Sequence, residues 1–259
     1  MIIDSNTHIT KDFKWFNTSL DASVDSLLSS MNQNNIHKSL ILPLPGVTTN
    51  EYVREICFKY PDRFIEGSSF NPGIYSTPEE SVSNFKKEII DNNFKIVKFH
   101  NRLGGYGLSD SRYIETLKFN NLLENPIPVA ICSIFHDKNQ KISVVPPNFI
   151  FDLSQELKNT KFLIMHGGGA WIFKVAEMIR NLNNVYLDLS YTISKYRESS
   201  IDLDIKWLCN NFDQRITWGS DSPEFTQKKA LLDFYEISDG ISPSKVDNIL
   251  GNNLLTFLK

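Results

Sequence analysis

The sequence alternates a short run rich in β-forming residues with a longer amphipathic segment, and it does so eight times. Each short run is mostly apolar throughout, which is typical of parallel strands that helices cover on the outside. Eight successive strand–helix units with right-handed crossovers predict a parallel sheet, and eight is the number of strands that closes a barrel. We therefore expect an α/β fold, a single (β/α)8 TIM barrel. The predicted strands are residues 2–4, 39–44, 64–70, 95–99, 128–133, 162–165, 185–189 and 216–218.

The segments between the predicted strands have the pattern of amphipathic helices. The third segment is marked most clearly, since Thr77 can cap a helix, Pro78 suits its first position and Glu80 completes a capping box. The predicted helices are residues 23–34, 50–60, 77–92, 113–124, 148–158, 170–182, 201–212 and 226–238.

The last segment, residues 242–259, is predicted to form an additional C-terminal helix that packs on the barrel. No linker, low-complexity tract or internal repeat divides the chain, and 259 residues suffice for one substantial core. We therefore expect one domain over residues 1–259. The apolar side chains expected to pack in the final helix are Ile249, Leu250, Leu254, Leu255 and Phe257.

Composition argues against several classes of partner. The formal net charge is -3 and there is no basic tract, so nothing favours nucleic acid or an anionic membrane as a partner. No apolar run approaches the ~20 residues of a membrane span, and the N-terminus lacks the pattern of a signal peptide, so we expect a cytoplasmic protein. The three cysteines, Cys57, Cys132 and Cys209, are widely spaced, which predicts reduced thiols rather than disulfides.

Polar residues follow the predicted strands where each strand ends. In a barrel of this kind the active site lies at the carboxyl ends of the strands. Asn6 and His8 lie two positions apart on the first strand, so their side chains point the same way. The sequence therefore predicts a catalytic floor at this end of the barrel. The residues expected there are Asn6, His8, Asn71, Lys98, His100, Cys132, His166, Ser190 and Asp221.

Seven segments, six of them at predicted strand ends and one in the C-terminal segment, together resemble the amidohydrolase-related family of metal-dependent TIM-barrel hydrolases. The resemblance covers nearly the whole chain, and the order and spacing of the motifs make the combination specific. The motifs are Ile2-Ile-Asp-Ser-Asn6-Thr-His8 (family pattern Asp-x-His-x-His), Ile96-Val-Lys98-Phe-His100, Pro128-Val-Ala-Ile-Cys132, Leu163-Ile-Met-His166-Gly-Gly, Val185-Tyr-Leu-Asp-Leu-Ser190, Trp218-Gly-Ser-Asp221-Ser-Pro223 and Ile249-Leu-Gly-Asn-Asn253.

The resemblance implies a set of metal-site positions. In the family, two histidines of the first strand, a histidine ending the fifth and the aspartate of the eighth hold a divalent ion, and the histidine of the sixth acts on the attacking water. This sequence departs from that pattern at two of the five positions, where an amide and a thiol replace imidazoles. The matching residues are Asn6, His8, Cys132, His166 and Asp221.

Two chemistries remain open at this set. A zinc or manganese ion could be bound by three of the four side chains His8, Cys132, His166 and Asp221, with the fourth, His166, acting on the water. Alternatively, the site works without metal: Asp221 is the general base, His8 and His166 polarise a carbonyl, and Asn6 supplies a hydrogen bond. The plainer interpretations are that Cys132 is a small buried hydrophobe and that Asp221 caps a turn.

The fourth strand and the loop after it carry candidates for substrate binding. Lys98 and His100 lie on one face of that strand, and Arg102 and Tyr106 follow in the loop 101–106. The ammonium of Lys98 and the forked guanidinium of Arg102 suit binding of a carboxylate or phosphate. Alternatively, Lys98 could form a salt bridge with Asp221 or Asp188.

Aromatic residues and one further histidine complete the candidates. Tyr191 and Trp218 could stack on a ring of the ligand, and His136 could line the mouth of the site. His37 precedes the second strand and is expected to be structural. The aromatic residues expected to be exposed, as candidates for a subunit contact in a homo-oligomer, are Trp15, Phe16, Trp171 and Phe173.

These observations predict a hydrolase, including a lactonase, that adds water to a lactone, cyclic amide or similar carbonyl of a small anionic substrate. Asp221 and His166 would be its acid and base groups. Two alternatives stay open: a decarboxylase-type lyase acting on a small organic acid, and a ligand-binding pseudoenzyme.

Overall fold

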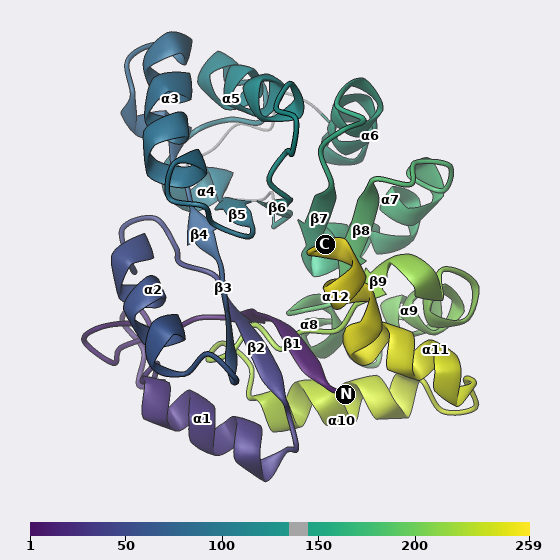
Figure 1. Ribbon diagram of the computed structural model, residues 1–259. Coiled ribbons are helices and arrows are strands. Elements are labelled where there is room, and N and C mark those ends of the chain that lie inside the picture. The colour runs from purple at the N-terminus through teal and green to yellow at the C-terminus, as the bar shows by residue number, and fades with distance from the viewer. Residues whose placement is uncertain (135–144) are drawn as a thin grey trace.

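A computed structural model describes residues 1–134 and 145–259. Its strands form a ring that helices surround, with every paired strand parallel to its partner within two sheets, β1–β3 and β4–β9 (Figure 1). All eight predicted strands are present, and the third is divided in two. The strands are β1 (Ile3–Thr7), β2 (Lys38–Ile41), β3 (Phe64–Glu66), β4 (Ser68–Ser69), β5 (Val97–Phe99), β6 (Val129–Cys132), β7 (Phe162–Met165), β8 (Val185–Asp188) and β9 (Ile216–Thr217).

Backbone contacts close the ring at two places. Between β3 and β4, Gly67 donates its N–H to the Ile41 carbonyl at 3.1 Å, and a Cβ at Gly67 would lie 2.7 Å from that oxygen. Between β9 and β1, the N–H of Ser5 donates to Trp218 O at 3.2 Å, and His8 N–H donates to Ser222 O at 2.8 Å. The (β/α)8 TIM barrel predicted from the sequence is therefore confirmed.

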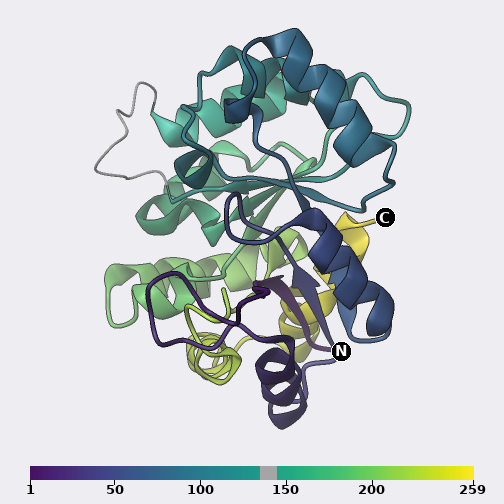
Figure 2. The same cartoon turned by 90° about the vertical axis from the view of Figure 1, so that its left-hand side faces the viewer.

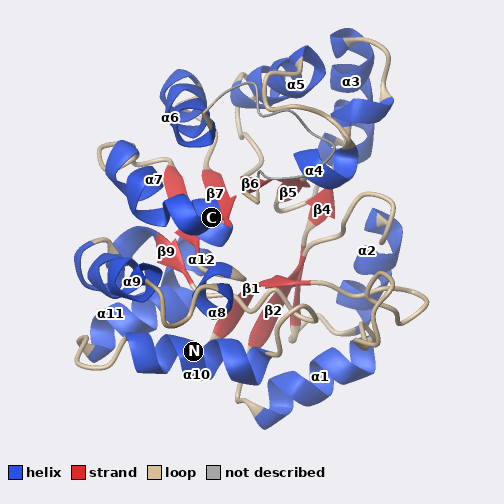
Figure 3. Cartoon of the chain, turned by 180° about the vertical axis from the view of Figure 1, so that it is seen from behind, coloured by secondary structure: helices blue, strands red, loops and turns tan. Residues whose placement is uncertain are grey.

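Helices cover the outside of the barrel, seen from behind in Figure 3. Thr77 caps the third predicted helix as expected, accepting the Glu80 N–H at 3.2 Å, but the Glu80 carboxylate reaches back to Ser76 N–H rather than to Thr77. Two short helices, α4 (Asn101–Gly104) and α8 (Thr192–Lys195), were not predicted. The helices that correspond to predicted ones are α1 (Val24–Gln33), α2 (Asn50–Lys59), α3 (Pro78–Phe85), α5 (Ser111–Asn121), α6 (Pro146–Glu156), α7 (Ile172–Met178), α9 (Ser200–Asn211) and α10 (Gln227–Ile237).

The C-terminal segment forms α11 (Pro243–Asp247), a π-helical stretch (Asn248–Asn252) and α12 (Asn253–Phe257), so it is helical throughout residues 243–257. As expected it packs on the barrel: Leu254 and Phe257 join Ile3, Leu40 and other strand side chains in a core inside the ring. Figure 2 shows α12 and both chain termini at the same end of the barrel. The helix therefore fills the end where the strands begin, and the carboxyl ends of the strands are left for the loops. Across residues 1–134 and 145–259, no helix has both the length and the apolar character needed to cross a membrane.

Candidate active site

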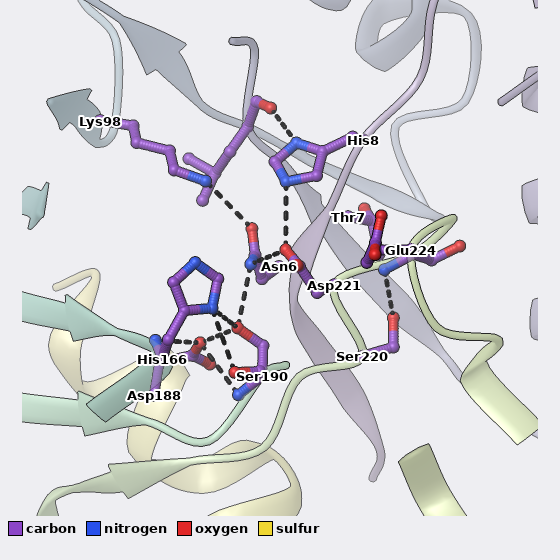
Figure 4. A network of polar contacts seen from close by, with 12 residues as sticks. Asn6, Thr7, His8, Lys98, His166, Asp188, Ser190, Ser220, Asp221 and Glu224 are labelled. Carbon is purple, nitrogen blue, oxygen red and sulfur yellow. Dashed lines mark hydrogen bonds and ion pairs between the residues drawn. The ribbon is translucent and has the colours of Figure 1, made fainter. Parts of the chain in front are cut away.

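Six buried polar side chains gather where the strands end, as Figure 4 shows. They come from five different strands or from the loops that follow them. The rule that a barrel places its site at the carboxyl ends of the strands thus brings together most of the residues expected from the sequence. The six are Asn6, His8, Lys98, His166, Ser190 and Asp221.

Asp221 is held at the centre of this group. Its backbone has a φ of 65°, an uncommon value for a residue with a side chain, and its N–H donates to the Asn6 carbonyl at 3.0 Å. Its Oδ1 accepts a hydrogen bond of 2.6 Å from Asn6 Nδ2 and lies 3.4 Å from His8 Nε2. Burial raises the pKa of Asp221, but nearby positive charge, from His166 first and also from Lys98, outweighs burial and holds this pKa below its usual value. The carboxylate is therefore charged and can accept a proton.

His8 is fixed on both sides of its ring. Its Nδ1 lies 2.6 Å from the Leu42 carbonyl, so Nδ1 carries the proton and Nε2 faces Asp221. The indole of Trp15 stacks on the imidazole, with centroids 5.2 Å apart, and donates its Nε1–H to Glu224 at 2.8 Å. Burial, helped by the charge of Lys98, lowers the pKa of His8. Neutral His8 thus presents a hydrogen-bond acceptor to the site.

The Asn6 amide connects three of its neighbours. Nδ2 donates to Ser190 Oγ at 2.9 Å as well as to Asp221, and Oδ1 accepts from Lys98 Nζ at 3.5 Å. The Lys98 amine is 1% exposed, and burial lowers its pKa. Both polar ends of the amide are therefore occupied by protein groups.

His166 is oriented by the strand next to it. Its Nδ1 lies 3.1 Å from the Ser190 carbonyl and 3.2 Å from Ser190 Oγ. Asp188 holds this arrangement, since its carboxylate accepts from Ser190 Oγ, Ser5 Oγ, Thr217 Oγ1 at 3.2 Å and the Ser190 N–H at 3.1 Å. Burial would lower the pKa of His166, but Asp221 and then Cys132 outweigh it and raise this pKa.

The three glycines after His166 allow the turn that places this imidazole. Residues 166–169 all have positive φ, which only glycine adopts at little steric cost. A Cβ at Gly168 would lie 2.7 Å from a methyl group of Val175. The tight turn expected from the sequence is confirmed, and His166 itself takes the uncommon φ of 64° at its start.

Cys132 ends β6 in polar surroundings. Its thiol lies within hydrogen-bonding reach of the His100 and His166 imidazoles and close to the charge of Lys98. Burial raises the pKa of Cys132, yet the two imidazoles more than offset burial and hold this pKa well below its usual value. These neighbours do not fit the plainer interpretation of Cys132 as a buried hydrophobe among apolar groups.

The other predicted binding residues lie at different depths. Arg102 is half-buried and lies near Lys98 and His100. Burial lowers the pKa of both groups, and the positive charge of Arg102 lowers it further. Tyr191 is half-buried, with its ring edge-on to His166 at 5.6 Å between centroids. Tyr106 is buried, and its ring packs against that of Tyr113.

Several expectations about aromatic and polar residues need correction. Trp218 is fully buried and donates its Nε1–H to Ala230 O at 3.2 Å on α10, so it cannot stack on a ligand. Trp15 is 4% exposed and serves the site instead of a subunit contact. Asn71 stabilises its own turn by accepting the Gly73 N–H at 2.9 Å. His37 accepts the Ile2 N–H and is structural, as expected.

The remaining residues leave two expectations untested. Phe16, Trp171 and Phe173 are exposed, so a contact between subunits stays a prediction. His136 lies outside the described residues.

The candidate metal ligands lie apart in the described residues. Among the side chains of residues 1–134 and 145–259, no three from His, Cys, Asp and Glu converge on one point. Asp221 and His8 approach each other, but an N–H of Asn6 already donates to the carboxylate. Cys132 lies beside His100 and His166 instead. The set of His8, Cys132, His166 and Asp221 implied by the resemblance therefore does not form one cluster in the described part of the chain, and metal binding stays a prediction.

Asp4 was missed as a candidate although it is the first residue of the Asp-x-His-x-His pattern. This fully buried carboxylate accepts two hydrogen bonds from Ser220, one from its N–H at 2.9 Å and one from its Oγ at 2.6 Å. It also accepts from Gln227 Nε2 at 2.9 Å and from the Asn6 N–H at 3.2 Å. Burial raises the pKa of Asp4 to about 6, although the bonds from Ser220 and Gln227 oppose this. Asp4 thus ties β1 to the loop that carries Asp221. Its place in the motif was the available signal.

The fold and the site are those of a TIM barrel with acid–base groups at the carboxyl ends of its strands. A family model described as amidohydrolase matches residues 13–257. The chain therefore belongs to the amidohydrolase family, as the motifs predicted. No curated protein sequence matches it.

Solved structures share the fold along nearly the whole chain. An uncharacterized TIM-barrel protein from Bordetella bronchiseptica has a TM-score of 0.83 at 18% identity, with 99% of this chain and 98% of that chain covered. A probable 2-pyrone-4,6-dicarboxylic acid hydrolase from Acinetobacter baumannii, with citric acid bound, has a TM-score of 0.65 at 18% identity and the same coverage.

A third structure with this fold is a 5-carboxyvanillate decarboxylase from Novosphingobium aromaticivorans, with bound manganese and 3-methoxy-4-hydroxy-5-nitrobenzoic acid. It has a TM-score of 0.68 at 14% identity, covering 100% of this chain and 97% of that chain. At these identities the likeness establishes the shared fold, on which several chemistries occur.

Proposed function

We propose that this protein is an enzyme that hydrolyses a lactone, cyclic amide or similar carbonyl of a small carboxylate-bearing substrate. The observation that carries the proposal is the contact of Asp221 with both Asn6 and His8 at the barrel mouth, with His166 acting on the same carboxylate. Water addition needs an acid and a base. The charged Asp221 carboxylate and neutral His8 can accept hydrogen bonds from water, and His166 favours its protonated form and can act as the acid.

The proposed step uses these groups without a metal. Asp221 accepts one proton of the attacking water, and the Nε2 of His8 accepts a hydrogen bond from the same water. His166, whose Nδ1 proton is given to Ser190, donates from Nε2 to the carbonyl oxygen as negative charge develops there. His8 therefore acts as an acceptor, which differs from the carbonyl-polarising role expected from the sequence. The bond to the ring oxygen or nitrogen then breaks, and the leaving group takes the proton.

Positive charge beside these groups supports an anionic substrate. Lys98 lies at the floor of the site and Arg102 close to it, so a carboxylate can be bound by an ammonium and a guanidinium together. The Acinetobacter and Novosphingobium relatives carry citric acid and a substituted benzoic acid in their structures, and both compounds are carboxylic acids.

Decarboxylation is the second candidate, because the same two cations would hold a carboxylate next to acid–base groups and one relative with this fold is a decarboxylase. A panel of lactones, cyclic amides and aromatic carboxylic acids, followed by proton NMR, separates the possibilities. Hydrolysis gives a ring-opened acid, decarboxylation gives a product that lacks one carboxylate, and a pseudoenzyme shows ligand-induced shifts with no product. We expect ring opening that persists after dialysis against a chelator. We also propose that residues 1–259 form one domain, which predicts one cooperative unfolding transition.

A further inference from the structure

Trp15 lies in the loop between β1 and α1 and belongs to neither of the two large cores of the barrel. It packs with Ala22 and Leu44 in a small separate cluster. Among residues 11–21 it is the only buried one, at 4% exposed. Trp15 is thus the side chain through which this loop is anchored at the mouth of the barrel, where its indole stacks on His8.

The indole fixes the plane of the His8 ring. The contact of Nδ1 with the Leu42 carbonyl at 2.6 Å holds one edge of the imidazole, and a ring held at one edge can still turn about that contact. The indole lies at 14° to the imidazole with the centroids 5.2 Å apart, so a turn of the imidazole would bring the two rings into collision. Since the lone pair of Nε2 lies in the ring plane, Trp15 sets whether this lone pair points toward Asp221, 3.4 Å away.

A hydrogen bond fixes the indole in turn. Trp15 Nε1 donates to Glu224 Oε2 at 2.8 Å, and because this N–H lies in the indole plane, the bond sets the tilt of that plane. A carboxylate acceptor makes the bond stronger than one between two neutral groups. Glu224 therefore determines the orientation of the ring that stacks on His8.

These contacts close in a ring that returns to Asp221. The N–H of Glu224 donates to the Asp221 carbonyl at 2.9 Å, so the anchor of the indole lies in the same turn as the carboxylate that faces His8. Backbone pairing already joins the two loops, because the His8 N–H donates to Ser222 O at 2.8 Å. Backbone bonds fix where the chain passes but leave the side-chain torsions free. The bond between Trp15 and Glu224 thus adds what the backbone does not supply.

We propose that Trp15 and Glu224 are positioning residues that direct His8 Nε2 and the Asp221 carboxylate to the same attacking water, a role that rests on the hydrolase function proposed above. Both residues act through His8, so they affect the chemical step and not the binding of the anionic group by Lys98. Loss of the bond between them is therefore expected to lower kcat and to leave KM near that of the wild type.

Nuclear magnetic resonance of the folded protein tests the positioning without a substrate. We would record the ring-proton signals of the five histidines in protein with isotope-labelled histidine and assign those of His8 by their absence in His8→Ala. The ring current of the stacked indole shifts the His8 signals upfield, so Glu224→Ala, which frees the indole, is expected to move them downfield. Glu224→Gln also removes the charge but keeps an oxygen acceptor, and Glu124→Ala removes an exposed carboxylate after α5; both should leave the His8 signals in place. Unmoved His8 signals in Glu224→Ala overturn the proposal.

Steady-state kinetics on a lactone that the wild type opens give the second readout. Trp15→Phe keeps an aromatic ring on His8 but lacks the N–H, so it should resemble Glu224→Ala. We expect kcat of both variants to fall by about 10- to 100-fold, with KM within about two-fold of the wild type. Glu224→Gln should recover most of this loss, and the control Trp207→Phe, on the exposed face of α9, should keep the wild-type rate. Melting temperatures confirm that each variant is folded.

The outcomes separate this proposal from the hydrolase function. Wild-type kcat in Glu224→Ala, or a raised KM at unchanged kcat, refutes the positioning role and leaves the hydrolase function standing. Equal losses in Glu224→Ala and Glu224→Gln also refute it, because the charge and not the bond would then be what matters. A protein that opens none of the lactones refutes the hydrolase function, and the His8 signals then decide the positioning role by themselves.

Discussion

Asn6 Nδ2 donates a hydrogen bond of 2.6 Å to Asp221 Oδ1, across 215 positions of sequence. The amidohydrolase pattern that this chain resembles has an imidazole at the position of Asn6. Here the Asn6 amide donates to the Asp221 carboxylate and accepts from Lys98 Nζ. An N–H group of Asn6 therefore faces Asp221, where a metal site would need a lone pair. The change at Asn6 therefore alters what Asp221 can bind.

Restoring both imidazoles tests that relationship. We expect the double variant Asn6→His, Cys132→His to bind about one zinc or manganese ion per chain after dialysis, since it supplies the four-ligand chemistry that zinc accepts. Elemental analysis of wild type, double variant and an Asn183→His variant on the exposed surface makes the comparison. A stoichiometric ion in the wild type that His8→Ala removes would show that the native donor set binds metal after all.

The Asp188 network is expected to contribute to stability as well as to the orientation of His166. Asp188→Asn replaces an acceptor of several hydrogen bonds by a group with two N–H donors, so buried donors lose their partner. We expect the free energy of unfolding in urea to fall by about 2–4 kcal/mol. The exposed Asp62→Asn variant is the control and should change it by less than about 0.5 kcal/mol. A loss for Asp188→Asn no larger than that of the control would show that the network is not stabilising.

Asp4 predicts a pH dependence of stability. Its pKa in the folded protein is about 6, against 3.8 as the reference, so between these values the folded state binds more proton than the unfolded state. The contribution of the protonated carboxyl is therefore complete below about pH 4 and is lost as the pH rises through about 6, at about 1.4 kcal/mol per pKa unit.

The measurement is urea unfolding of wild type and Asp4→Asn across this range. We expect the free energy of wild type minus that of the variant to fall by about 2–3 kcal/mol between about pH 4 and pH 7. A difference that stays constant with pH would contradict the raised pKa of Asp4.

Lys98 and Arg102 are expected to act on binding of the anionic group. Lys98→Met and Arg102→Leu should each raise KM for a carboxylate-bearing lactone by about 10- to 100-fold, because each removes a charge-assisted hydrogen bond. An uncharged lactone of the same ring size should show little change, and the exposed Lys195→Met variant should behave as wild type. Equal effects on charged and uncharged substrates would show that these residues do not bind the anion.

Much of the fold followed from local patterns. Apolar runs and helical periodicity located the strands and the main helices, and the rule for carboxyl ends of barrel strands brought His8, His166 and Asp221 to one mouth. The break of the third strand at Gly67 was not predicted, because it depends on where the β2 backbone passes.

The roles of two tryptophans show what local patterns cannot supply. Trp15 lies in a polar segment that reads as an exposed loop, yet it is buried on His8 and bound to Glu224. Trp218 ends a strand, yet its side chain points away from the mouth toward α10. Both outcomes depend on partners far away in the sequence, as do the contacts of Asp4 and Asp188. These partners are brought together only in the folded barrel, so a local sequence pattern cannot identify them.

The most direct test of the proposed function is the kinetics of Asp221→Asn on a lactone that the wild type opens. The amide keeps the shape of the side chain but cannot accept the proton of water, so we predict that kcat falls by at least about 100-fold. The matched Asp239→Asn variant on the exposed surface should keep the wild-type rate. Turnover by Asp221→Asn within about two-fold of wild type would contradict the account.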